Sequence, residues 1–557
     1  MQNNHEYRLR PPEDEIIYFL LIDRFANVDK TNDRGGLPAD DPRINDRLVT
    51  GFDPTSAHHF HGGDLRGVID HLDYIKALGA TAILLSPIFK NRTEWCGFTG
   101  YHGYWPLDFK NVDPHFGTNE IFRELVDAAH GRGMKIYMDI VVEHTAPVNQ
   151  YTEKVHGFRN SADYPGKSGR YKAEIPQQFR HARNPAFLND IANYECRGPI
   201  DSTREGQLKG ESCGMDKLKL DKKAVYDGLI KIYQYWIDEY GIDGYRIDSA
   251  KHCATEFFER FIPPLIERAK LRNIPNFHIF GEVAMGEPEM DVATRSTRGT
   301  ELPYVIDFPF ALTVIANVAG RGRTAMLQNL FADDVLYQGK AKTALRLPTF
   351  ISNHDRGRFG WYIRQAHKSA VDDDVKKRAI LANAMMFLLR GVPMIYYGDE
   401  LGFPGTGIDE LAREDMFESH VEVYKNEQSI GTGTLLKDAK EFDQAHPIYR
   451  AIQRLAKLRD TYPALKRGEQ EVCETSEKEG LFAVLRTDPS AAHKEKRKLL
   501  IAFNTSETPL TAQLHTKKLK HFSPVEVHGK FYDRPTIPGS YRVELDRLDY
   551  FVCIAEE

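Results

Sequence analysis

Short apolar runs recur along the chain and are separated by stretches with helical spacing. The runs are rich in Ile, Val, Phe and Tyr, which favour strands. Eight candidate strands lie at 16–22, 81–85, 135–142, 244–248, 278–283, 304–308, 349–352 and 393–397. At 119–132 and 224–240, apolar residues recur every three or four positions, as on one face of a helix. Eight strands alternating with helices predict a closed parallel (β/α)8 TIM barrel.

One long connection breaks this rhythm between the third strand and the fourth. It contains about a hundred residues, rich in Gly, Asn, Lys and Pro, and extends to about Leu220. A second long loop, from Gly402 to about Phe442, precedes a helical stretch at 447–459 that should close the barrel. We therefore expect an inserted subdomain after strand 3 of the barrel.

The pattern after about Gly468 alternates between apolar and polar residues, as at 481–485 and 499–503. Alternation of this kind predicts a terminal antiparallel β-sandwich domain. The expected domains are the two parts of the barrel at 1–145 and 221–465, the insertion at 146–220 and the β domain at 466–557.

Charge and composition limit the classes of partner. The 557 residues carry a net charge of -6 with no basic block, which argues against nucleic acid or an anionic membrane surface. No segment has the ~18 apolar residues needed to cross a bilayer. The six cysteines lack CxxC spacing and are interpreted mainly as buried thiols, although Cys196 and Cys213 could pair within one loop region. The compartment stays open: cytoplasmic if Met1 is the native start, periplasmic or secreted if a signal peptide was removed.

Acidic side chains follow several of the predicted strands. In such a barrel the carboxyl ends of the strands form the active site. A lone carboxylate at a strand end is more often a helix cap or an ion-pair partner, but a cluster favours acid–base chemistry. The polar residues at these ends are Asp139, Glu143, His144, Asp248, Glu282, His354 and Asp355.

Four segments carry a family resemblance, and they lie in the family's order on the expected strands. They read DIVVEH at 139–144, GYRIDSAKH at 244–252, FGEV at 280–283 and FISNHD at 350–355. A fifth, GYHGYWPLDF at 100–109, looks like a loop that places an aromatic ring under the scissile sugar. The chain resembles the α-amylase superfamily, glycoside hydrolase family 13, over roughly 14–465. Its motifs are closest to those of α-amylases and cyclodextrin glucanotransferases.

The resemblance implies three catalytic carboxylates. Asp248 would attack the anomeric carbon, Glu282 would protonate the leaving oxygen and later activate water, and Asp355 would stabilise the transition state. Arg246 lies two residues before Asp248 on the same strand, so its side chain points to the same side and can keep Asp248 ionised. The alternative for Arg246 is a purely structural ion pair.

The same resemblance implies a set of sugar-binding residues. His144 and His354 would donate hydrogen bonds to sugar hydroxyls and Tyr104 would stack on the reacting sugar. Lys251 and His252 follow the pattern associated with α-1,4 specificity and would line the leaving-group side. The remaining expected contacts are His102 and Trp105, which would flank the donor side, and Arg358, which would hold the loop of Asp355.

Two calcium sites are considered. The family usually has Asn where this chain has Glu143, so the usual site beside the insertion is expected to be empty or rebuilt. After the first strand, short-spaced oxygen ligands and a Gly-Gly-Asp segment suit a structural Ca²⁺ ion, against the alternative of a solvated turn. The candidate ligands are Asn27, Asp29, Asn32, Asp33, Gly62 and Asp64. The histidines at 58, 59 and 61 are expected to lie in a surface loop and not at zinc.

The leading hypothesis is an α-amylase-type retaining hydrolase of α-1,4-glucosidic bonds in starch-like glucans and maltooligosaccharides. The closest alternatives are cyclodextrin glucanotransferase, 4-α-glucanotransferase and cyclomaltodextrinase or maltogenic amylase activity. From other classes, a non-catalytic glycan-binding subunit would not need all three carboxylates. A metal-dependent barrel hydrolase would need Glu143, His144, His252 and His354 to meet at one ion.

Overall fold

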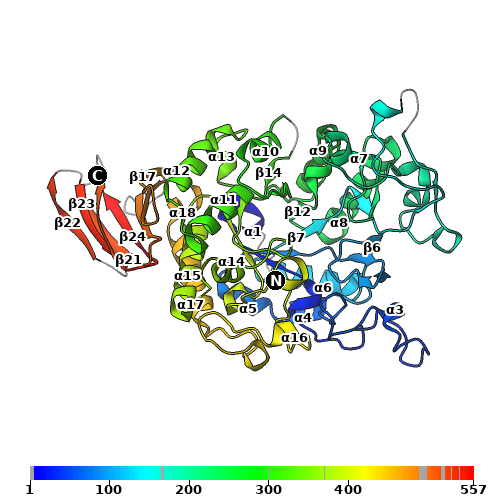
Figure 1. The fold of residues 1–557 in the computed structure, drawn as a ribbon, viewed down its shortest axis with the longest axis horizontal. Helices are drawn as coiled ribbons and strands as arrows, with labels where there is room; N and C mark the ends of the chain where they lie inside the picture. The colour runs from blue at the N-terminus through cyan, green and yellow to red at the C-terminus, as the bar shows by residue number, and fades with distance from the viewer. Residues whose placement is uncertain are drawn as a thin grey trace.

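Three parts follow one another in space along the molecule (Figure 1). The computed structural model describes residues 6–164, 169–299, 302–368, 371–488, 498–515, 521–527, 530–537 and 540–556. A helix-wrapped barrel lies in the middle, the segment inserted after β7 lies on one side of it, and C-terminal antiparallel sheets lie on the other.

The barrel is one sheet of eight parallel strands in the order β14-β13-β12-β7-β2-β1-β16-β15. Its open edges meet where the Asp307 N–H donates to the Pro348 carbonyl oxygen at 2.9 Å. The strands are β1 (Ile17–Leu20), β2 (Ala82–Leu85), β7 (Lys135–Ile140), β12 (Gly244–Ile247), β13 (His278–Gly281), β14 (Tyr304–Val305), β15 (Pro348–Thr349) and β16 (Val392–Tyr396). The predicted barrel is confirmed; seven strands are shorter than their apolar runs, and β16 has the predicted length but starts one residue earlier.

Helices cover the outside of the sheet, which explains why strands such as β1, β2 and β7 are buried at every position. The Thr118 hydroxyl caps α6 by accepting from the Ile121 N–H, and Gly241 ends α8 with φ 65°. The longer helices are α6 (Asn119–Gly131), α8 (Lys223–Tyr240), α9 (Thr255–Leu271), α12 (Ala325–Ala332), α14 (Phe359–Ala366), α15 (Asp372–Leu388) and α17 (Pro447–Thr461). Shorter ones include α4 (Leu65–Asp70), α5 (Leu72–Leu78), α7 (Arg204–Lys209), α11 (Phe308–Val314) and α18 (Pro463–Arg467).

The insertion starts and ends at one short antiparallel pair. β8 (His144–Thr145) pairs with β11 (Asp216–Lys217), so that Lys217 lies opposite His144. Asp216 fixes the first turn of the insertion, because its carboxylate accepts from the N–H groups of Val148 and Asn149. Between these strands lie β9 (Gln150–Tyr151), β10 (Ala173–Glu174) and α7. The insertion is therefore anchored directly beside the end of barrel strand β7.

The C-terminal strands form two antiparallel sheets, β17-β18-β19-β24-β21 and β20-β23-β22. Along β18 and β19 the side chains alternate: Phe482 and Ile501 join the barrel core, whereas Ala483 and Leu500 pack against the second sheet. The strands are β17 (Glu469–Glu474), β18 (Leu481–Thr487), β19 (Lys498–Asn504), β20 (Leu510–His515), β21 (His521–Val527), β22 (Lys530–Ile537), β23 (Ser540–Leu545) and β24 (Asp549–Glu556). This agrees with the predicted sandwich.

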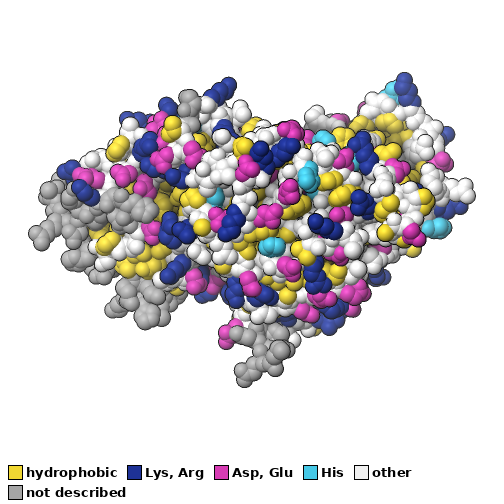
Figure 2. All heavy atoms as spheres, turned by 90° about the horizontal axis from the view of Figure 1, so that it is seen from below, with side chains coloured by type: hydrophobic (Ala, Val, Ile, Leu, Met, Phe, Trp, Pro, Cys, Tyr) yellow, Lys and Arg dark blue, Asp and Glu magenta, His cyan; other side chains and the backbone are white. Residues whose placement is uncertain are grey.

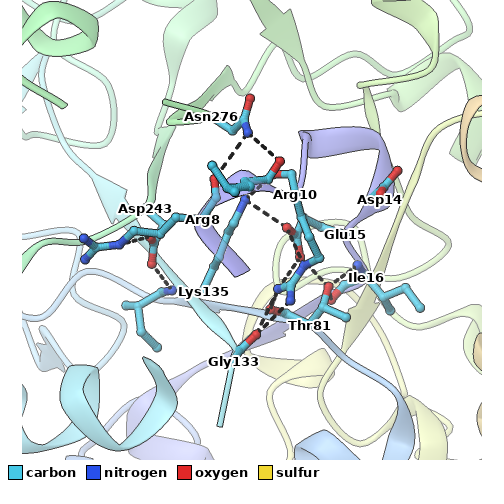
Figure 3. A network of polar contacts seen from close by, with 12 residues as sticks. Arg8, Arg10, Asp14, Glu15, Ile16, Thr81, Gly133, Lys135, Asp243 and Asn276 are labelled. Atoms are coloured by element: carbon cyan, nitrogen blue, oxygen red, sulfur yellow. Dashed lines mark hydrogen bonds and ion pairs between the residues drawn. The ribbon is translucent and has the colours of Figure 1, made fainter. Parts of the chain in front are cut away.

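A polar network closes the end of the barrel opposite the carboxyl ends of the strands (Figure 3). Arg10 contacts the carboxylate of Glu15 at 3.1 Å and donates to the carbonyl oxygens of Thr81 and Gly133. Lys135, at the start of β7, reaches the same Glu15 at 2.9 Å. The segment before β1 therefore ties the first residues of three neighbouring strands together.

Residues from the end of the barrel domain also bind this first segment. Arg459 of α17 donates to the Glu13 carbonyl oxygen at 3.2 Å, and Arg467 of α18 contacts the Asp14 carboxylate at 2.7 Å. The beginning and the end of the barrel domain are thus joined by direct contacts.

Cys196 and Cys213 do not form the pairing considered from the sequence: both are free thiols, and Cys196 is buried whereas Cys213 is exposed. Cys96 is also exposed, so the expectation of buried thiols holds only for some of the cysteines.

The face seen in Figure 2 carries acidic and basic side chains side by side, with no broad region of one sign. In the described part of the chain, no helix is long and apolar enough to span a membrane.

Candidate active site

Arg246 brings three carboxylates together at the carboxyl ends of neighbouring strands. Its guanidinium contacts Asp139 of β7, Asp248 directly after β12 at 3.2 Å and Glu282 directly after β13 at 3.0 Å. All four side chains are almost completely buried. One guanidinium holding both Asp248 and Glu282 keeps these carboxylates close, as in retaining glycosidases.

The turn after β12 aims a further donor at Glu282. Ser249 has φ 50°, an uncommon left-handed conformation for a residue other than glycine. In this conformation its backbone N–H donates to Glu282 Oε2 at 3.0 Å. Backbone strain at this point is typical of a functional site.

Burial raises the pKa values of two aspartates in the site. Burial and the negative charge of Glu282 raise the pKa of Asp248 to about 8, although Arg246 opposes the rise. Burial also raises the pKa of Asp139 to about 6, against the charge of Arg246. Asp248 therefore holds its proton more tightly than an isolated aspartate, because it is buried beside a second carboxylate.

Asp355 lies across from this cluster and is more open, with a side chain 37% exposed. Arg413, in the long loop after β16, contacts Asp355 Oδ1 at 3.2 Å and donates to the His354 carbonyl oxygen at 2.9 Å. Arg358, which we expected to hold this loop, instead contacts Asp399 and Glu414. Arg413 was missed in the sequence because its only signal was a position in a long loop.

Tyr104 and His354 lie at the centre of the same cluster. The Tyr104 hydroxyl donates to Asp139 at 2.8 Å and lies 2.9 Å from His354 Nε2, and the two rings are nearly parallel with centroids 5.4 Å apart. Burial, together with Arg413, lowers the pKa of His354 well below its usual value, so the ring is neutral. Its Nε2–H then donates to Tyr104.

An ammonium group lies beside Glu143, at the start of the insertion. Lys217 of β11 contacts the carboxylate of Glu143 and donates to the His252 carbonyl oxygen at 2.9 Å. Glu143 also lies 3.2 Å from His144 Nδ1. Although burial favours the neutral acid, Lys217 lowers the pKa of Glu143 to about 2. Lys217 thus joins the insertion to the loop after β12.

The residues of the metal-dependent alternative make other contacts in the structure. The carboxylate of Glu143 contacts the ammonium group of Lys217. His252 Nδ1 lies 2.9 Å from the Gln207 carbonyl oxygen and is therefore engaged in a hydrogen bond. His354 faces Tyr104 instead. Among the described residues, no three His, Cys, Asp or Glu side chains are grouped as metal ligands.

The expected sugar-binding residues form two groups in the structure. Lys251 and His252 lie on η6 (Ala250–His252), directly after the turn that contains Asp248 and Ser249, and the Lys251 ammonium donates to the Ala284 carbonyl oxygen at 3.0 Å. On the other side, the rings of His102 and Trp105 are 5.1 Å apart and perpendicular. His144 Nε2 lies 3.0 Å from the Tyr104 carbonyl oxygen, so a sugar hydroxyl would share this donor.

The candidate calcium loop is largely buried. The side-chain oxygen atoms of Asn27 and Asn32 are buried without a hydrogen-bond partner, and burial raises the pKa of Asp33 to about 6. A Cβ atom on Gly62 would lie 2.4 Å from Asp33 Oδ1, so these residues are in close contact. Asp64 caps α4 instead, because its carboxylate accepts from the N–H groups of Val28, Asp29 and Gly67.

The expectation of a surface loop at 58–61 is wrong for two of its three histidines. His59 and His61 are buried. His61 Nδ1 lies 2.7 Å from Asp415 Oδ1, and its backbone N–H donates to Asp23. These contacts link the first and last barrel loops, an arrangement that the local sequence does not reveal.

Comparison with known proteins agrees with this geometry. The family model described as the alpha amylase catalytic domain matches residues 19–435. The chain belongs to this family of glycoside hydrolases.

The chain is similar to an alpha-amylase of Streptomyces lividans, with 36% identity over 499 residues, which are 84% of this chain and 54% of that protein. It is also 30% identical to an intracellular maltogenic amylase of Bacillus subtilis over 72% of this chain and 57% of that protein. The solved structure of an Anoxybacillus alpha-amylase aligns with a TM-score of 0.71 and 26% identity over 98% of both chains. The chain spans about half the length of the curated relatives it matches.

Proposed function

We propose that the protein hydrolyses α-1,4-glucosidic bonds in starch-like glucans and maltooligosaccharides with retention of anomeric configuration. The observation that carries this proposal is the shared contact of Arg246 with Asp248 and Glu282, opposite Asp355. Relatives named as amylases support the substrate class.

In the first half of the reaction, Asp248 attacks the anomeric carbon while protonated Glu282 gives its proton to the leaving oxygen. Arg246 holds both groups in place and stabilises the ionised form of Asp248. Asp355, oriented by Arg413, faces the sugar that carries positive charge in the transition state. In the second half, Glu282 removes a proton from water, which attacks the glycosyl-enzyme and releases Asp248.

The acceptor decides between hydrolysis and transfer, because both reactions use the same glycosyl-enzyme. A cyclomaltodextrin glucanotransferase of Klebsiella oxytoca is 27% identical to the chain, which keeps transfer as the second candidate. We favour hydrolysis because the more similar relatives, at 36% and 30% identity, are named as amylases.

Products formed from end-labelled maltoheptaose over time test this proposal. We expect only shorter oligosaccharides, with the α-anomer formed first, as detected by chromatography and NMR spectroscopy. Chains longer than maltoheptaose or cyclic products would show a transferase instead. No conversion by protein with a native melting temperature would contradict both activities and support a glycan-binding role.

We further propose that Asn27, Asn32 and Asp33 bind a structural Ca²⁺ ion, as is frequent in this family. The unpartnered buried oxygen atoms of the two asparagines support this site, since buried acceptors without donors suit a hard cation. Asp29 and Asp64 already accept hydrogen bonds from Thr31 and from backbone N–H groups, so they shape the loop. Bound calcium would supply only stability here.

Calcium is expected to raise the melting temperature relative to an EDTA-treated sample. At a hundredfold excess over Kd the stabilisation is about 2.7 kcal/mol, a shift of roughly a few °C for a chain of this size. Asp33→Ala should abolish the shift, whereas Asp40→Ala, at an exposed position of the same loop region, should keep it. Equal melting temperatures of the wild type with calcium and with EDTA would refute the site.

A further inference from the structure

A pocket of about 420 Å³ opens at the base of the barrel, at the end opposite the catalytic carboxylates. Ile16, Thr81 and Met134 line it, and these residues come directly before strands β1, β2 and β7. Its volume is in the range of small-molecule binding sites. No residue that lines this base pocket has a role in the reaction described above.

Positive charge predominates around the base pocket, although the net charge of the whole chain is -6. Five cationic and two acidic side chains line it, namely Arg10, Lys76, Arg132, Lys457 and Lys466 against Asp14 and Asp460. Both acids already have partners. Asp14 contacts Arg467 at 2.7 Å, and Asp460 contacts Lys466 at 3.0 Å. An anion would therefore be attracted to the base pocket.

Two of the lysines have no partner of their own. The ammonium groups of Lys76 and Lys457 form no hydrogen bond or ion pair within the described part of the chain. The helices that carry them, α5 and α17, come very close together: a Cβ atom on Gly79 would lie 2.4 Å from the Cβ atom of Ala456. Close packing at this point holds the two lysine-bearing helices in place, so the unpaired charges belong to a rigid wall.

The neighbouring cations add to this charge. Arg132 contacts Asp73 at 2.7 Å, but Asp73 is 79% exposed, and a pair of this kind contributes little to stability. Arg132 can therefore exchange Asp73 for a ligand at small cost. Arg10 and the buried Lys135 share the single carboxylate of Glu15 (Figure 3), so these three groups together carry one net positive charge.

The base pocket also has an apolar part, which indicates the kind of anion. It is formed by Ala77, Ala80, Met134 and Ala456. None of the described residues that line the pocket is aromatic, whereas a nucleotide base usually stacks on such a ring. A phosphate group offers several charged acceptor oxygens to separate ammonium and guanidinium donors. A phosphate on a sugar-sized ring would therefore match both parts of the pocket.

We propose that the base pocket binds a small sugar phosphate. Lys76, Lys457 and Arg132 contact its phosphate oxygen atoms, and the sugar ring lies on the apolar part. Because Arg10 precedes β1 and Lys457 lies on α17, one ligand contacts both ends of the barrel domain and stabilises its folded state. The site does not depend on the proposed hydrolysis, since it lies at the other end of the barrel.

Isothermal titration calorimetry of the whole protein with glucose 6-phosphate tests this site. We expect a Kd on the order of 1 mM or lower, and binding weaker by roughly tenfold or more for glucose and for the double variant Lys76→Ala, Lys457→Ala. Inorganic phosphate should also bind more weakly. Glucose 6-phosphate should raise the melting temperature of the wild type. Both lysines are exposed, so the double variant should fold and keep wild-type kcat for maltoheptaose.

The matched control is the double variant Lys231→Ala, Lys270→Ala, which removes two exposed lysines of α8 and α9 that do not line the base pocket. It should keep the wild-type affinity for glucose 6-phosphate. No binding to the wild type at about 10 mM, or equal affinities of the two double variants, would overturn the proposal. So would binding of glucose, inorganic phosphate or adenosine monophosphate as tightly as glucose 6-phosphate.

Discussion

Asp248→Asn is expected to lose nearly all hydrolysis of maltoheptaose, with kcat reduced by roughly four to six orders of magnitude. The amide cannot attack the anomeric carbon, and it also removes the negative charge that Arg246 holds at 3.2 Å. The measurement is kcat from reducing-end release, together with mass spectrometry of the protein after reaction with a 2-fluoro glycosyl fluoride. The wild type should gain the mass of one glycosyl group and the variant should not.

Asp227→Asn is a suitable control, because Asp227 is partly exposed on α8 and forms a surface ion pair with Lys223. This control should keep wild-type kcat, and both variants should keep the wild-type melting temperature within a few degrees. An Asp248→Asn protein with wild-type turnover would refute the assignment of the nucleophile. Labelling at Glu282 in place of Asp248 would reverse the two roles.

Lys217→Met should lower the free energy of unfolding by roughly 3–5 kcal/mol, because it leaves the buried carboxylate of Glu143 without its counter-charge. Both side chains of the pair are nearly fully buried, at 2% and 3% exposure. Thermal or chemical unfolding measures the effect. Lys223→Met, which removes an exposed lysine, should change the stability by less than about 0.5 kcal/mol.

The double variant Glu143→Gln, Lys217→Met should be more stable than Lys217→Met alone, since no unpaired charge remains. The contribution of the Glu143–Lys217 pair to the free energy of unfolding should decrease as the pH falls. The pKa of Glu143 is lowered to about 2 in the folded protein, so its contribution to stability is complete above its usual value near 4.5 and is lost as pH falls towards 2. Wild type and Lys217→Met should therefore converge in acid. If the wild type and Lys217→Met differed in free energy of unfolding by the same amount from pH 7 to pH 2, the ion pair of Glu143 with Lys217 would not be the source of the difference.

The apolar runs predicted all eight barrel strands because a strand covered by helices needs apolar side chains on both faces. The motifs also placed Asp248, Glu282 and Arg246 correctly beside one another, since the period of a strand and the order of the barrel determine which side chains meet. The strands and the positions of these three side chains depend on residues that are near in sequence or on a repeated architecture. A single sequence contains both kinds of information.

Contacts between distant loops could not be predicted in this way. Lys217 and Glu143 are 74 positions apart, and Arg413 and Asp355 are 58 positions apart, in segments without a recurring pattern. The departure at Glu143 did indicate a changed site, but nothing local showed that a lysine of the insertion would fill it. The burial of His61 has the same cause, because its partner Asp415 lies 354 positions away.

The contacts of Arg459 and Arg467 with the segment before β1 have a consequence for biosynthesis. These pairs are separated by 446 and 453 positions, so the base of the barrel stays incomplete until the ribosome has made nearly the entire barrel domain. Closing so long a loop is slow. Strand β1 therefore lacks its neighbour β16 during most of synthesis, and an unpaired apolar strand of this kind favours aggregation.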